Sequence, residues 1–133
     1  MNYSPILIVS GEPNSIFLEI YFKILRINKI KSPLILISSE RLLRLQMKKL
    51  RFKKKIRNLD VSKLDQYKLN NSSINLKNVK YNPKKAFEKI SKNSNRFLKN
   101  SFEVAFKILK QGKIKKFING PISKKKFLDK KFL

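Results

Sequence analysis

The sequence contains no cysteine and no histidine among its 133 residues. Without cysteine the chain has no disulfide, no thiolate zinc site and no cysteine nucleophile, which fits a reducing compartment. Without histidine it lacks the commonest metal ligand and the commonest general base. Serine hydrolysis of the familiar kind is excluded as well, because Ser10, Ser15 and Ser123 have no histidine to activate them.

Long apolar runs are also missing. No stretch approaches the roughly 18 apolar residues that a membrane helix requires, and no basic segment precedes the short apolar run near the N-terminus. Hydrophobic residues make up 41% of the chain and aromatic residues 11%, which are values typical of globular proteins. We therefore expect a soluble, cytoplasmic protein that forms at most one domain, residues 1–133.

Acidic residues are scarce. Eight Asp and Glu stand against 33 Lys and Arg, which gives a formal charge of +25 and suggests nucleic-acid binding. Arginine forms bidentate hydrogen bonds with phosphate and with guanine. Only six of the basic residues are arginine. Lysine, isoleucine and asparagine are all abundant and all have AT-rich codons. Genome drift is therefore the simpler explanation and no nucleic-acid partner is expected, although the lysine runs 53–55 and 124–126 could bind RNA weakly.

The chain has only three glycines, and two of them lie in turns that follow apolar runs. Gly11 follows the run 6–9 and Gly120 follows Phe117-Ile118, whereas Gly112 follows a helical stretch. Glycine in so glycine-poor a chain marks positions that need backbone freedom or close approach. The carboxyl ends of parallel strands are where open α/β sheets place their ligands. Both turns are therefore candidate site segments.

Apolar patterning predicts a parallel α/β sheet with flanking helices. Residues 6–10 and 34–38 are apolar without alternation, as expected of strands covered on both faces. Asn14 or Ser15 is expected to cap a first helix whose buried stripe is Ile16, Ile20, Ile24 and Ile27, widened by Phe17 and Tyr21. Ser39 is expected to cap a second helix, with Leu42, Leu43, Leu45 and Leu50 on its buried side. The order β-α-β-α favours a parallel sheet.

The second half of the chain is less regular. Residues 60–82 are rich in Asn, Ser and Lys, with a candidate strand at 74–79. Asn82-Pro83 predicts the start of a long helix that ends near Gly112. Its expected buried face is Ala86, Ile90, Phe97, Ser101, Ala105 and Ile108. A buried strand, residues 116–119, is expected before the second glycine turn.

The residue chemistry of both turns leaves their role open. The Gly11-Glu12-Pro13 turn leads toward a helix N-terminus, which attracts anions, but it lacks the further glycines of a dinucleotide fingerprint and the Gly-Lys-Ser/Thr of a P-loop. An ordinary strand-to-helix turn is the simpler interpretation there and at Asn119-Gly120-Pro121. Lys124 could meet a phosphate or carboxylate, although such a lysine is more often solvated. Glu12 and Glu19 could act as a pair, but surface placement is the simpler expectation.

The first turn resembles the N-terminal motif of the 4-hydroxythreonine-4-phosphate dehydrogenase family. That motif is Thr-Pro-Gly-Glu/Asp-Pro-Ala-Gly-Ile-Gly-Pro-Glu. The matching residues are Gly11, Glu12, Pro13, Ile16 and Glu19. Both later glycines and the second proline of the motif are absent here.

The second turn is similar to the family's Thr-Gly-Pro-Ile/Val-x-Lys motif. Gly120, Pro121, Ile122 and Lys124 agree with it, while Asn119 stands in place of the threonine. The order and spacing of the two motifs extend the resemblance over nearly the whole chain.

The resemblance implies an isocitrate-dehydrogenase-like α/β fold and NAD-dependent oxidation, then decarboxylation, of 4-phosphohydroxy-L-threonine in pyridoxal 5'-phosphate biosynthesis. It further implies a homodimer and a divalent metal held by histidines that lie, in the family, beyond the part matched here. On this interpretation the chain is an N-terminal portion of such an enzyme, inactive alone. Its expected contribution is one wall of the substrate cleft, formed by Gly11, Glu12, Pro13, Asn119, Gly120, Pro121 and Lys124, with Lys124 the candidate for direct contact with substrate.

Two alternatives stay open at the level of sequence. The first is a small basic RNA-binding or ribosome-associated protein, which the charge favours. The second is a related dehydrogenase that acts on a different four-carbon phosphorylated acid.

Overall fold

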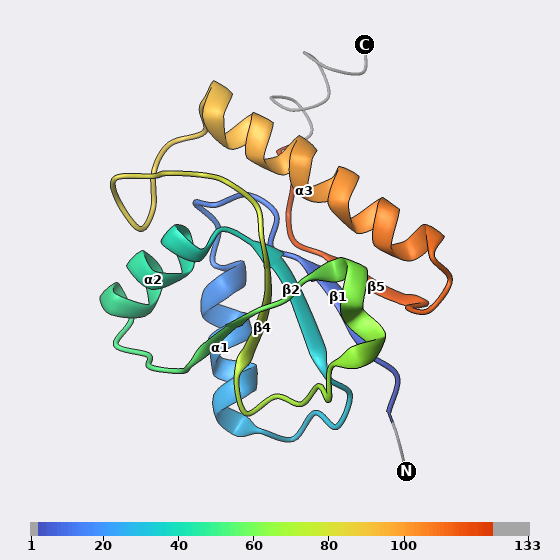
Figure 1. Ribbon diagram of the computed structural model, residues 1–133. Coiled ribbons are helices and arrows are strands. Elements are labelled where there is room, and N and C mark those ends of the chain that lie inside the picture. The colour runs from blue at the N-terminus through green and yellow to red at the C-terminus, as the bar shows by residue number, and fades with distance from the viewer. Residues whose placement is uncertain (1–2, 124–133) are drawn as a thin grey trace.

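A computed structural model describes residues 3–123 as a single five-stranded sheet with helices around it (Figure 1). All strand pairs are parallel and the strand order is β3-β4-β2-β1-β5. The predicted parallel α/β architecture is therefore confirmed. The elements are β1 (Ile6–Val9), α1 (Phe17–Ile27), β2 (Leu34–Ser38), α2 (Glu40–Lys49), β3 (Ile56–Asn58), the 3-10 helix η1 (Val61–Gln66), β4 (Ile74–Asn78), α3 (Lys92–Lys110) and β5 (Lys116–Asn119).

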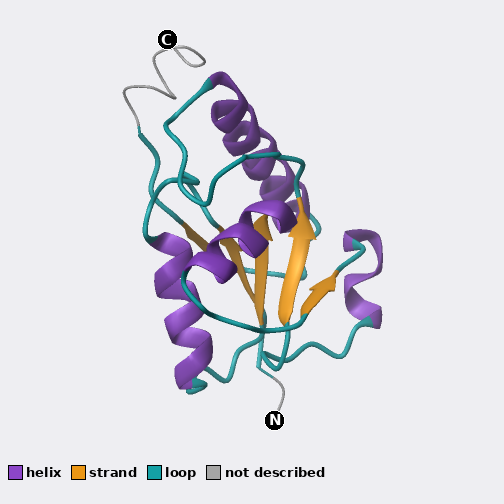
Figure 2. Ribbon diagram, turned by 90° about the vertical axis from the view of Figure 1, so that its left-hand side faces the viewer, coloured by secondary structure: helices purple, strands orange, loops and turns teal. Residues whose placement is uncertain are grey.

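Helices cover both faces of the sheet (Figure 2). The right-handed rule for parallel crossovers places α1 and α2 on one face, because both connections run in the same direction across the sheet. The connection from β4 to β5 runs in the opposite direction, so α3 lies on the other face, against β1 and β2. No helix within residues 3–123 is long and apolar enough to span a membrane.

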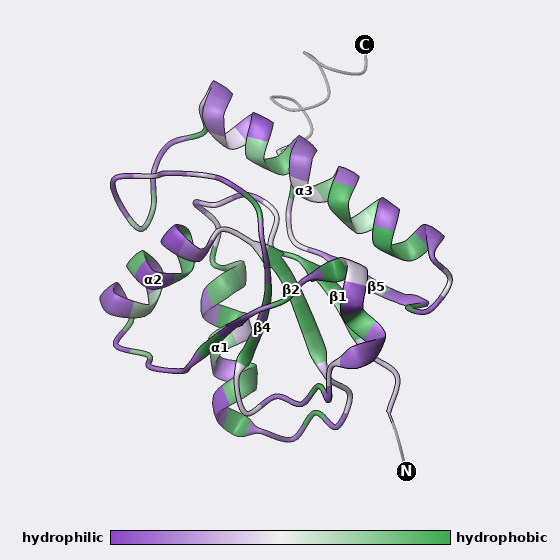
Figure 3. Ribbon diagram, in the orientation of Figure 1, coloured by the Kyte–Doolittle hydropathy of each residue, from purple (hydrophilic) through white to green (hydrophobic). Residues whose placement is uncertain are grey.

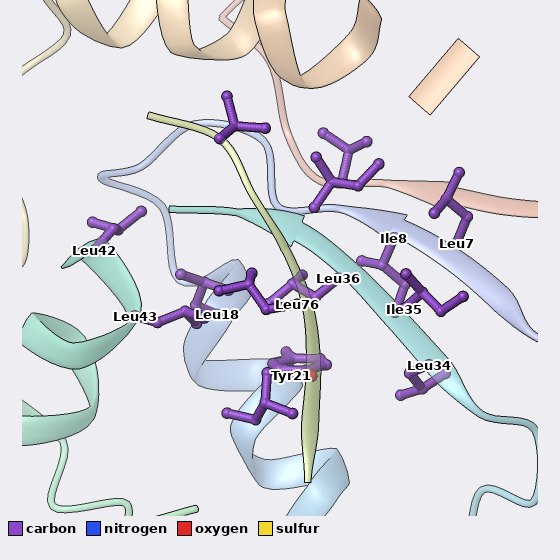
Figure 4. Packing of buried hydrophobic residues seen from close by; sticks show 14 of the residues in the cluster. Leu7, Ile8, Leu18, Tyr21, Leu34, Ile35, Leu36, Leu42, Leu43 and Leu76 are labelled. Carbon is purple, nitrogen blue, oxygen red and sulfur yellow. The ribbon is translucent and has the colours of Figure 1, made fainter. Parts of the chain in front are cut away.

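The core lies around β2, whose five residues are all buried. Leu18 of α1 lies close to Leu43 of α2 and to Leu36 and Leu76 of the two central strands (Figure 4). Complete burial of one such side chain contributes roughly 1.5–3 kcal/mol. β2 is accordingly hydrophobic along its length, whereas hydrophilic and hydrophobic residues alternate along α3 (Figure 3).

Strand register aligns the ends of the three strands that matter for the candidate site. Val9 at the end of β1 pairs with Ile37 of β2 on one side and with Asn119 of β5 on the other. The segments that follow β1 and β5 therefore leave the sheet at the same level and side by side.

The predicted buried stripe of α1 is wrong at three of its four isoleucines. Ile16, Ile20 and Ile27 are exposed to 65%, 45% and 61%, and Ile24 is only partly buried. The buried face is made instead by Leu18, Tyr21, Phe22 and Leu25. The helix is apolar around most of its circumference, so spacing alone did not identify the face that meets the sheet.

The cap of α1 is displaced by one residue from the prediction, although Ser15 Oγ accepts a hydrogen bond from the Phe17 N–H at 3.3 Å. Ile16 is the N-cap residue and its side chain makes no capping hydrogen bond. The Ser15 N–H donates to the Glu12 carbonyl at 3.1 Å, which closes a turn over residues 12–15 and delays the helix. In α2, by contrast, the predicted cap is confirmed: Ser39 Oγ accepts from the Leu42 N–H.

The long helix begins nine residues after the predicted start at Pro83. Ser91 and Ser94 form a reciprocal capping box, so α3 begins at Lys92 and both Ala86 and Ile90 lie outside it. The rest of the predicted face is confirmed, since Phe97, Ser101, Ala105 and Ile108 are buried. The strand expected at 74–79 is confirmed as β4, whereas β3 and η1 had no predicted counterpart.

β5 is confirmed in place but not in burial. The sequence predicted a buried strand, yet β5 is mostly exposed, with Ile118 exposed to 48%. Within the described residues β5 pairs only with β1, so it forms an edge of the sheet. Phe117 alone packs inward, against Phe102 and Phe106 of α3.

Candidate functional site

The two glycine turns meet at the carboxyl edge of the sheet, on the side where α3 begins (Figure 1). The Gly120 N–H donates to the Val9 carbonyl at 2.7 Å, and the Glu12 N–H donates to the Pro121 carbonyl at 2.8 Å. These two bonds extend the β1–β5 pairing past the ends of both strands. Segments more than 100 residues apart in the sequence are thereby joined backbone to backbone.

Glycine is required at both positions because the two backbones approach too closely for a side chain. A Cβ added at Gly11 would lie 2.5 Å from the Gly120 carbonyl carbon, and one added at Gly120 would lie 2.1 Å from the Ser10 oxygen. Gly11 also has a φ of +78°, which L side chains rarely adopt. The close approach predicted for these glycines is therefore between the backbones of the two turns.

Glu12 is a buried carboxyl group without a partner. Its residue is only 6% exposed, and neither Oε1 nor Oε2 has a hydrogen-bond partner within residues 3–123. Burial raises the pKa of this carboxyl group above its usual value, because a charged carboxylate is costly out of water. Surface placement was the simpler expectation for Glu12, and the structure overturns it. A carboxyl group in this state can take up a proton or receive a cationic group.

Gln46 connects this turn to the segment before α3, and the sequence analysis did not identify it. Its Nε2 donates to the Pro13 carbonyl and to the Ala86 carbonyl, both at 2.9 Å, while its Oε1 has no partner among the described residues. Because Gln46 lies four and three residues after Leu42 and Leu43, a helical-wheel analysis that includes polar residues places it on the buried face of α2.

Tyr81 adds a second ionisable group near Glu12. Burial is the main cause that raises the pKa of the Tyr81 phenol, and the negative charges of Glu88 and Glu12 raise it further. Its ring stacks on Phe97 with centroids 5.0 Å apart, and its carbonyl accepts a hydrogen bond from Ser39 Oγ. The phenol therefore stays protonated and available as a donor over an extended pH range.

Buried serines line the ends of the central strands. Ser10 Oγ donates to Ser38 Oγ at 2.9 Å, and both residues are almost fully buried. Ser10 and Ser38 each come at the end of an apolar run, so this position in the sequence was the signal for a polar layer at the carboxyl edge. Their mutual hydrogen bond joins the ends of β1 and β2.

The remaining candidate residues are Asn119, Pro121, Lys124 and Glu19. Asn119 and Pro121 lie at the carboxyl edge and are exposed; the Asn119 Nδ2 donates to the Gly120 carbonyl at 3.0 Å. Lys124 lies outside the described residues. Glu19 does not join Glu12, because it lies on α1 and pairs with Lys23 at 3.6 Å.

The described residues do not fit a metal site or a dinucleotide cradle. No group of three or more His, Cys, Asp or Glu side chains within residues 3–123 could hold a metal ion. The space above Gly11, where a phosphate would approach a glycine turn, is filled by the backbone at 120–121. Within residues 3–123 the divalent metal that the resemblance implies therefore has no cluster of ligands, and the Gly11 turn leaves no open space for a phosphate of NAD.

No family model and no curated protein sequence matches the chain. Its fold, however, is similar to solved structures of 4-hydroxythreonine-4-phosphate dehydrogenases. The enzyme from Burkholderia phymatum superposes with a TM-score of 0.79 at 18% identity, covering 94% of this chain and 38% of that one. A putative enzyme from Salmonella typhimurium gives 0.77 at 20% identity, with 93% and 38% covered. The enzyme from Klebsiella pneumoniae gives 0.75 at 15% identity, with 91% and 38% covered.

These comparisons agree with the resemblance seen in the two motifs, and at these identities they establish the fold. The chain spans little more than a third of the length of the structures it matches. It has the α/β fold of part of a 4-hydroxythreonine-4-phosphate dehydrogenase.

Proposed function

We propose that this chain is the N-terminal portion of an NAD-dependent dehydrogenase that oxidises 4-phosphohydroxy-L-threonine and then decarboxylates the product, in pyridoxal 5'-phosphate biosynthesis. The observation that carries the proposal is the fold match over 94% of the chain, combined with two family-like motifs whose turns join at the carboxyl edge of the sheet. Carboxyl edges of parallel strands are the usual place for ligands in such sheets.

In this proposal the chain supplies one wall of the cleft. The joined turns at Gly11 and Gly120 provide a rigid base, and Asn119 and Pro121 face solvent from it. Lys124, four residues after Gly120, would contact the phosphate or carboxylate of the substrate through its ammonium group. Glu12, buried beneath the turn, would hold a proton or face a cationic group of the substrate.

The metal ligands and the rest of the NAD site would come from polypeptide not contained in these 133 residues. The chain has no histidine, and its described part has no metal-binding cluster. We therefore expect residues 1–133 alone to give no turnover, and we expect the complete enzyme to be a cytoplasmic homodimer. When bound, the metal and NAD would supply the Lewis acid and the hydride acceptor.

The experiment begins with the coding DNA after Leu133. An open frame that continues into a histidine-containing segment would be expressed whole and assayed for NADH formation with 4-phosphohydroxy-L-threonine, NAD and a divalent metal. We expect NADH formation by that product and none by residues 1–133. Turnover by residues 1–133 alone would overturn the fragment proposal, and an inactive whole product would overturn the substrate assignment. A stop codon directly after Leu133 would leave a chain without catalytic machinery and would count against a dehydrogenase role.

A further inference from the structure

The arginines of this chain are gathered in one part of the sequence. Five of the six, Arg26, Arg41, Arg44, Arg51 and Arg57, lie within residues 26–57. Residues 20–59 carry 13 Lys and Arg against a single acidic residue, Glu40. Drift toward AT-rich codons adds lysine along a whole chain, but it gives no reason for arginine to gather in one stretch. The structure shows where these charges lie.

Two adjoining hollows, of about 820 Å³ and about 790 Å³, are lined by seven of these 13 basic side chains, three of them arginines. The hollows share Phe52, Lys53 and Lys54, so they form one continuous surface, here called the basic groove. Within residues 3–123 no acidic side chain lines either hollow. The other cationic lining residues are Arg26 and Lys31 in the first hollow and Arg44, Lys48 and Arg51 in the second.

The basic groove lies at the amino edge of the sheet, opposite the glycine turns. Its lining residues come shortly before three strands: Lys31 before β2, Lys54 before β3 and Ser72 before β4. In Figure 1 the loops that enter β2 and β4 lie together at the lower edge of the molecule, away from α3. The groove is therefore separate from the proposed cleft.

Most charges of the groove are free to meet a ligand. Of its seven cationic side chains, Arg44 alone has an acidic partner within the described residues, Glu40 at 2.8 Å. A concave surface lined by charges of one sign concentrates the field and attracts ions of the opposite sign. Arg26 lies over the Phe52 ring, 5.3 Å from its centroid, which holds one guanidinium at the groove.

At one position of the groove an arginine has the left-handed backbone conformation, which costs less free energy for glycine or asparagine. Helix α2 ends in a Schellman motif, in which the Phe52 N–H donates to the Met47 carbonyl at 2.9 Å. The residue in the left-handed position of such a motif is usually glycine or asparagine. Here it is Arg51, with a φ of +54°. This turn directs residues 52–54 into the groove.

We propose that the basic groove binds the phosphate backbone of nucleic acid without reading its sequence. One hollow alone already has the volume of a small-molecule site. Two such hollows in one continuous surface therefore favour an extended polyanion over a single small phosphate compound. Phe52, the one aromatic residue among the described residues that line the groove, is only 7% exposed and offers bases no stacking platform. Binding is therefore electrostatic, carried by lysine and arginine contacts to phosphate, and independent of the proposed dehydrogenase role.

The test compares two triple variants that remove the same charge from different surfaces. In the groove variant Lys48, Lys53 and Lys54 become Gln; in the control variant Lys99, Lys107 and Lys110 of α3, all exposed, become Gln. Each removes three positive charges from a chain of formal charge +25. Fluorescence anisotropy with a labelled single-stranded RNA of about 20 nucleotides measures the affinity between about 50 and 200 mM salt.

We expect the groove variant to lose affinity at least about tenfold near 100 mM salt and its log–log salt slope to fall by about 2, from a loss of about 0.7 per phosphate contact. The control variant should lose less than about threefold. Arg51→Lys, which keeps the charge, should weaken binding by a smaller factor through loss of two-point phosphate contact.

Equal losses in the two triple variants would overturn the proposal, because binding would then follow total charge. Absence of wild-type binding near 50 mM salt would overturn it as well. Inorganic tripolyphosphate serves as the competitor. If it displaces the RNA at a concentration equal to that of the RNA, the groove binds small polyphosphates and the nucleic-acid assignment is wrong. Far-ultraviolet circular dichroism of each variant verifies that the fold is retained.

Discussion

The two edges of the sheet differ in what fills them. At the carboxyl edge the turns after β1 and β5 are packed backbone against backbone, and Ser10 and Glu12 among them are buried. At the amino edge long basic side chains surround open hollows and their charges reach solvent. The backbone packing at the carboxyl edge therefore leaves little space for larger side chains, whereas the amino edge has such space. Substitutions should be costly at the first and nearly free at the second, at least for folding.

The largest effect is expected from Gly120→Ala. The new methyl group would lie 2.1 Å from the Ser10 oxygen, which is backbone and does not move aside easily. We expect the free energy of unfolding to fall by about 3 kcal/mol or more, measured by urea denaturation. Gly112→Ala is the matched control: its Cβ meets nothing within 4 Å but its φ is +80°. It should cost only about 1–2 kcal/mol. Equal losses in both variants would contradict the close packing of the two turns.

Glu12→Gln should stabilise the protein near neutral pH. The pKa of Glu12 is raised in the folded state, so the folded protein holds a proton that the unfolded chain releases. The contribution of Glu12 to the free energy of unfolding is fully present below the unfolded pKa of about 4.5. It is lost as pH rises through the higher pKa of the folded state. At about pH 7 the variant, which stays neutral, should be more stable than the wild type, because it does not bury a charge.

The control for Glu12→Gln is the same pair of proteins at about pH 4, where the wild-type carboxyl group is largely protonated and the difference should shrink. Urea denaturation at several pH values gives this difference directly. A stability difference that does not change with pH would show that Glu12 is not buried as an unpaired carboxyl group.

The strands that are covered on both faces could be predicted from the sequence, because a run such as Leu34-Ile35-Leu36-Ile37 has no helical or alternating pattern. β3 was missed for the opposite reason: Ile56-Arg57-Asn58 is short, half-exposed and contains one apolar residue. The start of α3 depended on contacts far along the chain. Arg41 and Gln46 of α2 bond the carbonyls of residues 83 and 86 and hold that segment outside the helix.

The candidate site was predictable in position but not in detail. An apolar run followed by Gly-Glu-Pro or Asn-Gly-Pro indicates a turn at a strand end, and both turns are found there. Each glycine makes room for the backbone of the other turn. This depends on β1 and β5 being neighbours in the sheet, which no local sequence pattern indicates. The burial of Glu12 depends on the same packing. A role for these residues in binding substrate stays a prediction.

The smallest effect is expected at the amino edge. The groove variant, with Gln at positions 48, 53 and 54, should change the free energy of unfolding by no more than about 0.5 kcal/mol, because these side chains make no ion pair among the described residues. Removal of like charges could even raise stability slightly at low salt. Urea denaturation in low and in moderate salt measures both effects. A loss as large as that of Gly120→Ala would mean that the lysines support the fold, and the contrast between the two edges would then be wrong.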